Sequence, residues 1–127
     1  MKISENTMNE YIGTLMQSRT QAHIYHLQTT SYAKHKALNG YYEDIIDVID
    51  GLVEAYQGKY EILKDYKMLG TLKDLESDDD IVKYFEQIAK YCELKREKLP
   101  QDSYIKNHYD EVDSLIRSTL YKLRVLG

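Results

Sequence analysis

The chain of 127 residues is poor in the residues that break helices or cross-link chains: it has one Pro, six Gly, one Cys and no Trp. Few breakers in a chain that is 30% charged favour an all-α protein. The single thiol, Cys92, excludes an internal disulfide and a zinc site built from several cysteines. A chain of this length suits one core, so we expect residues 1–127 to form a single domain.

Long apolar runs are also absent. No stretch approaches the roughly 20 apolar residues that a membrane-spanning helix needs. The N-terminal segment MKISENTMNEY lacks the apolar core of a signal peptide, so we expect a cytoplasmic protein that does not bind a membrane. The net charge of −4, with Lys and Arg scattered among acids, weighs against DNA binding, because nucleic-acid binders usually present a basic patch.

Apolar residues recur at helical spacing in four segments. The pattern predicts helices over about 7–30, from 32 or 34 to 56, over 77–98 and from 102 or 103 to the C-terminus. Gly58 is expected to cap the second helix, and Pro100 to end the third. Residues 59–76 are mixed and suggest a short helix or two, broken at Gly70. The expected fold is a four-helix bundle with a longer connection between its second and third helices.

Two histidines and two carboxylates form the candidate site: His23, His35, Asp50 and Glu54, spaced 12, 15 and 4 residues apart. Asp50 and Glu54 would share one helix face, with about 5–6 Å between their Cβ atoms. Such a mixed set of nitrogen and oxygen ligands suits iron, zinc or manganese. Two further carboxylates flank the same stripe and are reserve candidates: Glu43 and Asp47.

Plain structural roles compete with these assignments. Taken singly, an acid on a helix usually faces solvent and a histidine is usually a packing or surface residue. Asp78, Asp79 and Asp80 are best explained as a helix start, where acids favour the N-terminal dipole, with cation binding as the alternative. Cys92 falls on the apolar stripe of the third helix, so we expect a buried and inert thiol.

The order and spacing of the four candidate residues resemble the mini-ferritins, the Dps-type proteins of the ferritin-like superfamily. In that family two histidines, an aspartate and a glutamate follow one another at the same intervals. LYKLRVL (120–126) resembles the end of the family's last helix, and DDIVKYFEQIAKYCELKREKLPQDS (79–103) its third helix and exit. The runs HLQTTSYAKHKAL (26–38) and GLVEAYQG (51–58) also resemble short ferritin-like proteins of tailed phages, for which the compartment would be the host cytoplasm.

The resemblance implies a ferritin-like bundle that forms homo-oligomers, from a dimer up to a shell of twelve subunits. It implies a site shared by two subunits, with His23 and His35 from one and Asp50 and Glu54 from the other. There iron(II) would bind and be oxidised by peroxide or dioxygen, and the iron would be stored in the shell. The four residues would then be both metal ligands and catalytic residues.

Two alternatives remain open at this stage. Where the family typically has an acid four residues after the second histidine, this chain has Asn39, and where it often has Trp beside the first, this chain has Ile24. These departures favour a non-catalytic helical bundle that serves interaction or assembly, for example in a phage programme. The third hypothesis is a structural zinc or manganese site that His26 joins with His23.

Overall fold

The structure, a computed structural model, describes residues 2–127, with side chains from Thr7 onward. It contains four long helices: α1 (Lys2–Gln28), α2 (Tyr32–Lys59), α3 (Asp79–Lys95) and α4 (Ser103–Tyr121). A 3-10 turn, η1 (Arg96–Lys98), follows α3, and a π-helical turn, η2 (Lys122–Leu126), follows α4. Residues 2–127 contain no strand, so the predicted all-α four-helix bundle is confirmed.

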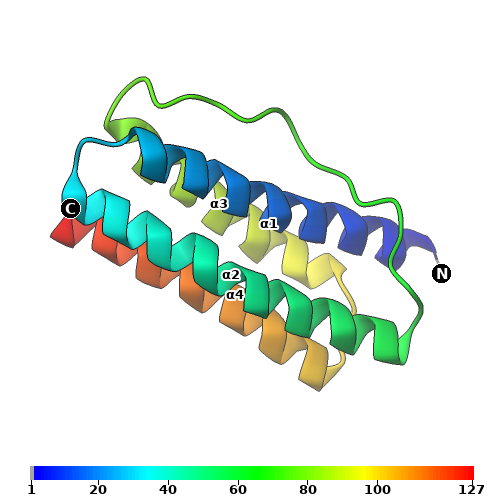
Figure 1. Cartoon of the computed structure of the whole chain (residues 1–127). Helices are drawn as coiled ribbons and strands as arrows, with labels where there is room; N and C mark the ends of the chain where they lie inside the picture. The colour runs from blue at the N-terminus through cyan, green and yellow to red at the C-terminus, as the bar shows by residue number, and fades with distance from the viewer. Residues whose placement is uncertain (1) are drawn as a thin grey trace.

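The order of the helices in space is set by one long connection (Figure 1). Helices α1 and α2 run antiparallel, and α3 and α4 form a second antiparallel pair. Residues 60–78 travel back along the whole bundle between these pairs, so α3 starts at the same end as α2 and runs parallel to it. The fold is therefore a bundle with one long crossover rather than a plain up-down-up-down bundle. No helix among the described residues has the length and apolarity that crossing a membrane would require.

The ends of the helices differ from the predicted ones in places. Helix α1 starts at Lys2 and stops at Gln28, two residues before the expected end. Ser31 caps α2, because its side-chain oxygen accepts a hydrogen bond from the Lys34 backbone N–H at 3.2 Å. The cap predicted at Gly58 is wrong: Gly58 lies inside the last turn of α2, and the cap is Tyr60.

The core forms along the apolar stripes of all four helices. The stripes predicted for α3 and α4 are confirmed, and Cys92 is fully buried among them, which raises the pKa of its thiol. On α2 the apolar pattern of the sequence also includes Tyr42 and Val53, but these two side chains are only half-buried, and their neighbours Tyr41 and Leu52 are buried instead. On α1 the predicted stripe was too wide, since two of its members are exposed: Met16 and Leu27.

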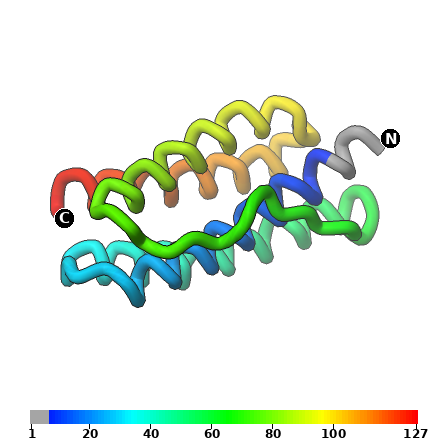
Figure 2. The backbone as a smooth tube through the Cα atoms, turned by 90° about the horizontal axis from the view of Figure 1, so that it is seen from above, coloured from blue at the N-terminus to red at the C-terminus, as the bar shows by residue number. Residues whose placement is uncertain are grey.

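The helices predicted within 59–76 are wrong, because residues 60–78, which we call the strap, are not helical. The strap lies extended along α1 (Figure 2), and side chains of α1 satisfy its backbone. The Gln21 amide both donates to the Lys73 carbonyl and accepts from the Lys73 N–H, each at 2.8 Å. Three more α1 side chains hydrogen-bond the strap in the same way: Asn9, Gln17 and Gln28. These bonds replace those of a helix.

One glycine lets the strap approach α1 this closely. A Cβ atom placed on Gly13 would lie 1.8 Å from the carbonyl oxygen of Lys67, a distance that no side chain tolerates. The strap leaves α1 at the other end of the bundle, where Asp80 begins α3 by accepting hydrogen bonds from the backbone N–H groups of Glu76 and Ser77. The helix start predicted at the acidic triplet is therefore confirmed.

Candidate metal centre

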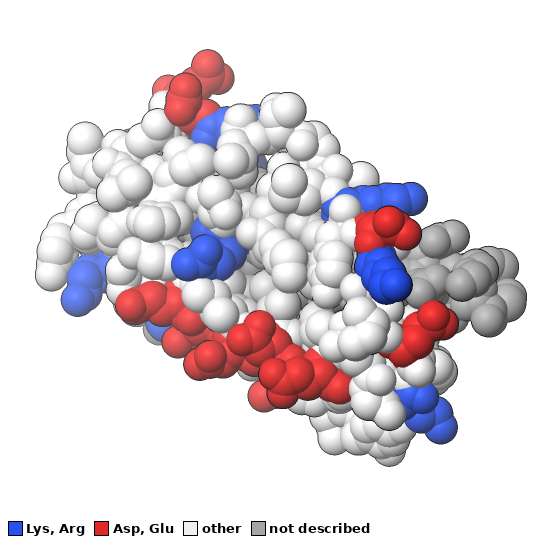
Figure 3. Space-filling model, turned by 45° about the vertical axis from the view of Figure 1, so that its right-hand side comes forward, with Lys and Arg blue, Asp and Glu red and all other residues white. Residues whose placement is uncertain are grey.

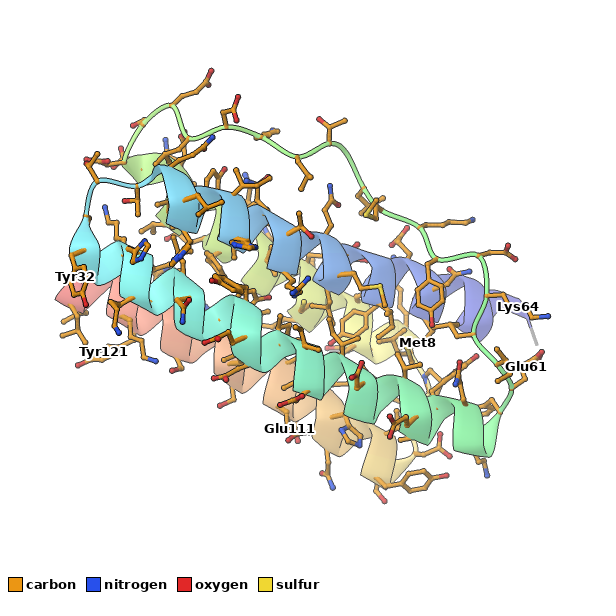
Figure 4. The ribbon with its side chains drawn as sticks, viewed as in Figure 1. Met8, Tyr32, Glu61, Lys64, Glu111 and Tyr121 are labelled. Carbon is orange, nitrogen blue, oxygen red and sulfur yellow. The ribbon has the colours of Figure 1, made fainter. Side chains whose placement is uncertain are left out.

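The end of α1 and the start of α2 are joined by a pair of interlocked histidines. The Nδ1 of His26 lies 2.8 Å from the carbonyl oxygen of His35, and the Nδ1 of His35 lies 2.9 Å from that of His26. A carbonyl only accepts, so both Nδ1 atoms carry hydrogen, and the neutral form of each ring has its lone pair on Nε2. The rings stack at 3.7 Å between centroids. Tyr32, at this end of the bundle in Figure 4, stacks on the outer side of His35.

His23 lies one turn earlier on α1 and packs against α2. Its ring stacks on Tyr42 at 4.4 Å between centroids, and it is half-buried. Tyr42 is held in turn by Asn39, whose side-chain oxygen accepts the Tyr42 hydroxyl at 2.7 Å. The Asn39 amide also donates to Glu43 at 2.8 Å. The position that departs from the mini-ferritin pattern therefore helps to order the side chain against which His23 packs.

The two candidate carboxylates lie further along α2, away from the histidines. Asp50 and Glu54 are both exposed, and no hydrogen bond or ion pair within the described residues engages either of them. Asp50 lines a groove of ≈ 400 Å³ between α1 and α2 together with Arg19. The remaining lining of this groove is largely apolar: Met16, Thr20, Ile46 and Ile49.

A single chain does not bring the four predicted ligands together. In the part of the chain that the structure describes, no three side chains of His, Cys, Asp or Glu are arranged to hold a metal ion. The reserve candidates do not change this, since Asp47 is exposed and Glu43 is engaged by Asn39. The acidic triplet has one member, Asp80, whose carboxylate accepts backbone N–H groups, which lowers its pKa.

The interior of the bundle contains no buried carboxylate among the described residues that could bind a metal. The buried polar residues among those described include amides, hydroxyls and one histidine, but no Asp or Glu. The middle of the core holds large aromatic side chains in edge-on contacts, namely Tyr11 against Tyr109 and Tyr41 against Phe85. Any metal chemistry of the described residues therefore belongs to the surface of the bundle.

The charges of this surface fall into two groups. Acids on α3 and α4 are neutralised within the chain: Arg96 pairs with Asp110 and Asp113 at 2.6 and 2.7 Å, and Arg117 pairs with Glu93 at 2.6 Å. The acids of α2 have no such counter-ions, and a band of acidic side chains crosses the face shown in Figure 3. The exposed acids of α2 are Glu43, Asp44, Asp47, Asp50 and Glu54.

Sequence reasoning gave no role to Arg19, which only interrupted the apolar stripe of α1. The structure places its guanidinium in the same groove as Asp50, and its Nε atom is buried without a hydrogen-bond partner. The sequence placed His26 only in the alternative zinc or manganese site, together with His23, whereas in the structure its ring is locked to His35. The signal for His26 was its position three residues after His23, on an adjoining part of the helix surface.

The fold and the surface features define the class as a four-helix bundle with one long crossover and a histidine cluster at one end. A family model covers residues 26–123, and the chain belongs to that family, the family of unknown function DUF5856. The chain is also similar to an uncharacterized 14.6 kDa protein in the mobD-ri intergenic region of Enterobacteria phage T4, with 40% identity over 50 residues. These residues make up 39% of this chain and 39% of that protein. No solved structure matches the chain.

The phage relative agrees with the predicted resemblance to phage proteins, and its name states no activity. The matched part of that relative is well below two thirds of its length. The family description likewise names neither a metal nor a partner. The observations that bear on function are therefore the histidines, the carboxylates and the topology of the bundle.

Proposed function

We propose that the protein is a ferritin-like, Dps-like iron-binding protein that oxidises iron(II) at a site shared by two copies of the chain. His23 and His35 of one copy would face Asp50 and Glu54 of the other. The ligand set is the one that the resemblance to mini-ferritins implies. The single long crossover supports the ferritin-like class, because bundles of that class have one such connection.

The ring of His35 is the observation that carries the proposal. Its Nδ1–H donates to the carbonyl of His26 at 2.9 Å, which fixes the tautomer and leaves the Nε2 lone pair for a metal. Metal-binding histidines in proteins almost always have their second nitrogen held in this manner. The carboxylates of Asp50 and Glu54 supply the negative charge that iron(II) needs, and no hydrogen bond or ion pair from another described residue engages them.

Iron is both the bound species and the substrate of the proposed reaction. Imidazole nitrogens and carboxylate oxygens hold iron(II) without filling its coordination sphere, which leaves room for the oxidant. Two irons give up one electron each, and peroxide accepts these two electrons and two protons and leaves as two waters. In air, dioxygen accepts the two electrons and two protons and leaves as hydrogen peroxide. The role of the chain is to bind and orient the iron. Zinc or manganese would occupy the same ligands without this reaction, and storage would require assembly into a shell.

A titration with iron(II) under anaerobic conditions, followed by air, tests the proposal. We expect saturable binding and then oxidation faster than in buffer alone. The double variant Asp50→Asn/Glu54→Gln should lose both, since it removes the two charges and keeps side-chain size. The matched control neutralises acids elsewhere: D78N/D79N/D80N should bind and oxidise iron as the wild type does. Loss of iron binding in the triple variant alone would place the site at the start of α3 and overturn the proposal.

A second candidate function is favoured by the contacts of Asn39. This residue replaces an expected acid and instead orders Tyr42, on which His23 stacks. These contacts fit a bundle that retains the scaffold for interaction or assembly and does not turn over iron. Retention of a metal without oxidation would instead support a structural zinc or manganese site. The titration separates the cases, because the interaction protein would bind no iron(II) at all.

A further inference from the structure

The groove between α1 and α2 contains two opposite charges that form no ion pair with any described residue. Arg19 on α1 and Asp50 on α2 line the groove, together with the largely apolar side chains of Met16, Ile46 and Ile49. Arg19 and Asp50 form no ion pair with each other or with any other described residue. The groove is therefore an apolar surface that carries one unpaired cation and one unpaired anion.

Arg19 differs from every other arginine of the chain. Arg96, Arg117 and Arg124 each bind a carboxylate at 2.6 or 2.7 Å. The Nε of Arg19 is shielded from solvent and has no acceptor among the described residues. A buried donor without an acceptor is costly, so such groups are normally paired. Among the described residues, Arg19 is therefore the arginine whose guanidinium binds no carboxylate.

The charges of Arg19 and Asp50 are opposite and lie in the same groove, so a second copy of the chain offers a counter-ion to each of them. We propose that the α1–α2 groove docks against the same groove of a second copy, with Arg19 bound to the partner's Asp50. In a two-fold assembly the same contact forms twice, because each copy offers both charges. The surface beside the groove suits such an interface, because Arg19 is its one charge among a row of uncharged α1 side chains. These uncharged side chains follow one another at intervals of four, three and four: Met16, Thr20, His23 and Leu27.

This pairing deepens the proposed function, because it concerns the same Asp50 that would bind iron. Arg19 and His23 are four residues apart, so they lie on one face of α1, and in the proposed dimer this face meets the partner's α2. Without metal, Arg19 is the counter-ion of the partner's Asp50. Iron(II) competes with the guanidinium for that carboxylate, so Arg19 sets how readily the site loads. The pairing itself requires no metal, and its test is run without one.

Charge reversal tests the pairing directly. In Arg19→Glu homodimers two acids would face each other twice, and in Asp50→Arg homodimers two cations would. Each variant alone should therefore dissociate, with its dimer dissociation constant raised about tenfold or more. In an equimolar mixture, the acid introduced at position 19 of one copy meets the cation introduced at position 50 of the other, and the unchanged Arg19 and Asp50 meet as well. The mixture should therefore recover the wild-type sedimentation profile in chelator-treated buffer.

Two controls keep the result interpretable. Asp44→Arg makes the same charge change on α2 but in the groove toward α4, and it should leave the wild-type assembly unchanged. Circular dichroism must show that each variant keeps its helices. The inference is overturned if the wild type is a monomer, if either reversal leaves the assembly intact, or if the mixture stays dissociated. Failure of the iron titration with successful recovery of the mixture would overturn the proposed function and leave this interface standing.

Discussion

Helix α1 has two very different faces. The face toward the strap is complete within the chain: Gln21 makes two hydrogen bonds to Lys73, and Gly13 lets the strap backbone touch the helix. The face toward the α1–α2 groove is incomplete, because neither Arg19 nor Asp50 forms an ion pair with a described residue. The face toward the strap stabilises the fold. We propose that the face toward the groove binds a second copy of the chain.

Among the substitutions that test the difference between the two faces of α1, Gly13→Ala should have the largest effect on stability. Gly13→Ala places a methyl group where the carbonyl oxygen of Lys67 lies, so the strap must move and its bonds to α1 weaken. We expect a loss of about 3 kcal/mol in the free energy of unfolding, measured by urea denaturation. Gly40→Ala makes the same chemical change where nothing lies within 4 Å and should gain about 0.5–1 kcal/mol. Equal effects of the two changes would show that the strap does not lie tightly on α1.

Removal of the Gln21 side-chain amide should cause the next largest loss of stability. Gln21→Ala removes two hydrogen bonds and leaves the backbone groups of Lys73 without their partners. The expected loss is about 1–3 kcal/mol in the same denaturation experiment. Thr20→Ala, next to it but on the groove side of α1, should change stability by less than about 0.5 kcal/mol. A Thr20 variant as unstable as the Gln21 variant would erase the proposed difference between the two faces.

A pH-dependent effect is expected where the strap joins α3. Two backbone N–H groups hold the pKa of Asp80 below its usual 3.8, so its carboxylate stabilises the folded state above that pH. This stabilisation is lost as the pH falls through 3.8 and then through the lower pKa of the folded state. Asp80→Asn should therefore be less stable than the wild type at pH 7, and the difference should vanish in acid. Asp78→Asn, whose side chain makes no capping bond, is the control.

The smallest effect on stability should come from the candidate ligands on α2. Asp50 and Glu54 are exposed and unbonded, so Asp50→Ala/Glu54→Ala should keep its helices and unfold within about 0.5 kcal/mol of the wild type. Iron(II) binding should nevertheless disappear in an anaerobic titration. A large loss of stability would mean that the carboxylates are needed by the fold itself, which would contradict their assignment to a partner.

The sequence was sufficient to predict the four helices, since their apolar stripes depend on local spacing. It did not predict the strap, because the partners that keep residues 60–78 extended are side chains some 50 residues earlier on α1, such as Gln21. Their spacing of Asn9, Gly13, Gln17 and Gln21, one every four residues, was the available signal. It has the period of a helix face, which is equally typical of a solvated surface.

The candidate site likewise has features that the sequence predicts and features that only the structure shows. The position of Asp50 and Glu54 on one side of α2 follows from their spacing of four residues. Both side chains are exposed in the structure. The lock between His26 and His35 was not predictable, because it depends on the turn that places two backbone carbonyls opposite two rings. The meaning of Arg19 was hidden as well, since only the structure shows which arginines have carboxylates within reach.

The most direct test of the shared iron site uses two inactive variants. His23→Ala/His35→Ala lacks the imidazoles, and Asp50→Ala/Glu54→Ala lacks the carboxylates, so neither should oxidise iron(II) alone. After subunit exchange, half of the dimers are mixed and each holds one intact site, so we expect about a quarter of the wild-type oxidation rate. A mixture that stays as inactive as its two components, although subunit exchange is verified, would contradict a site built from two chains.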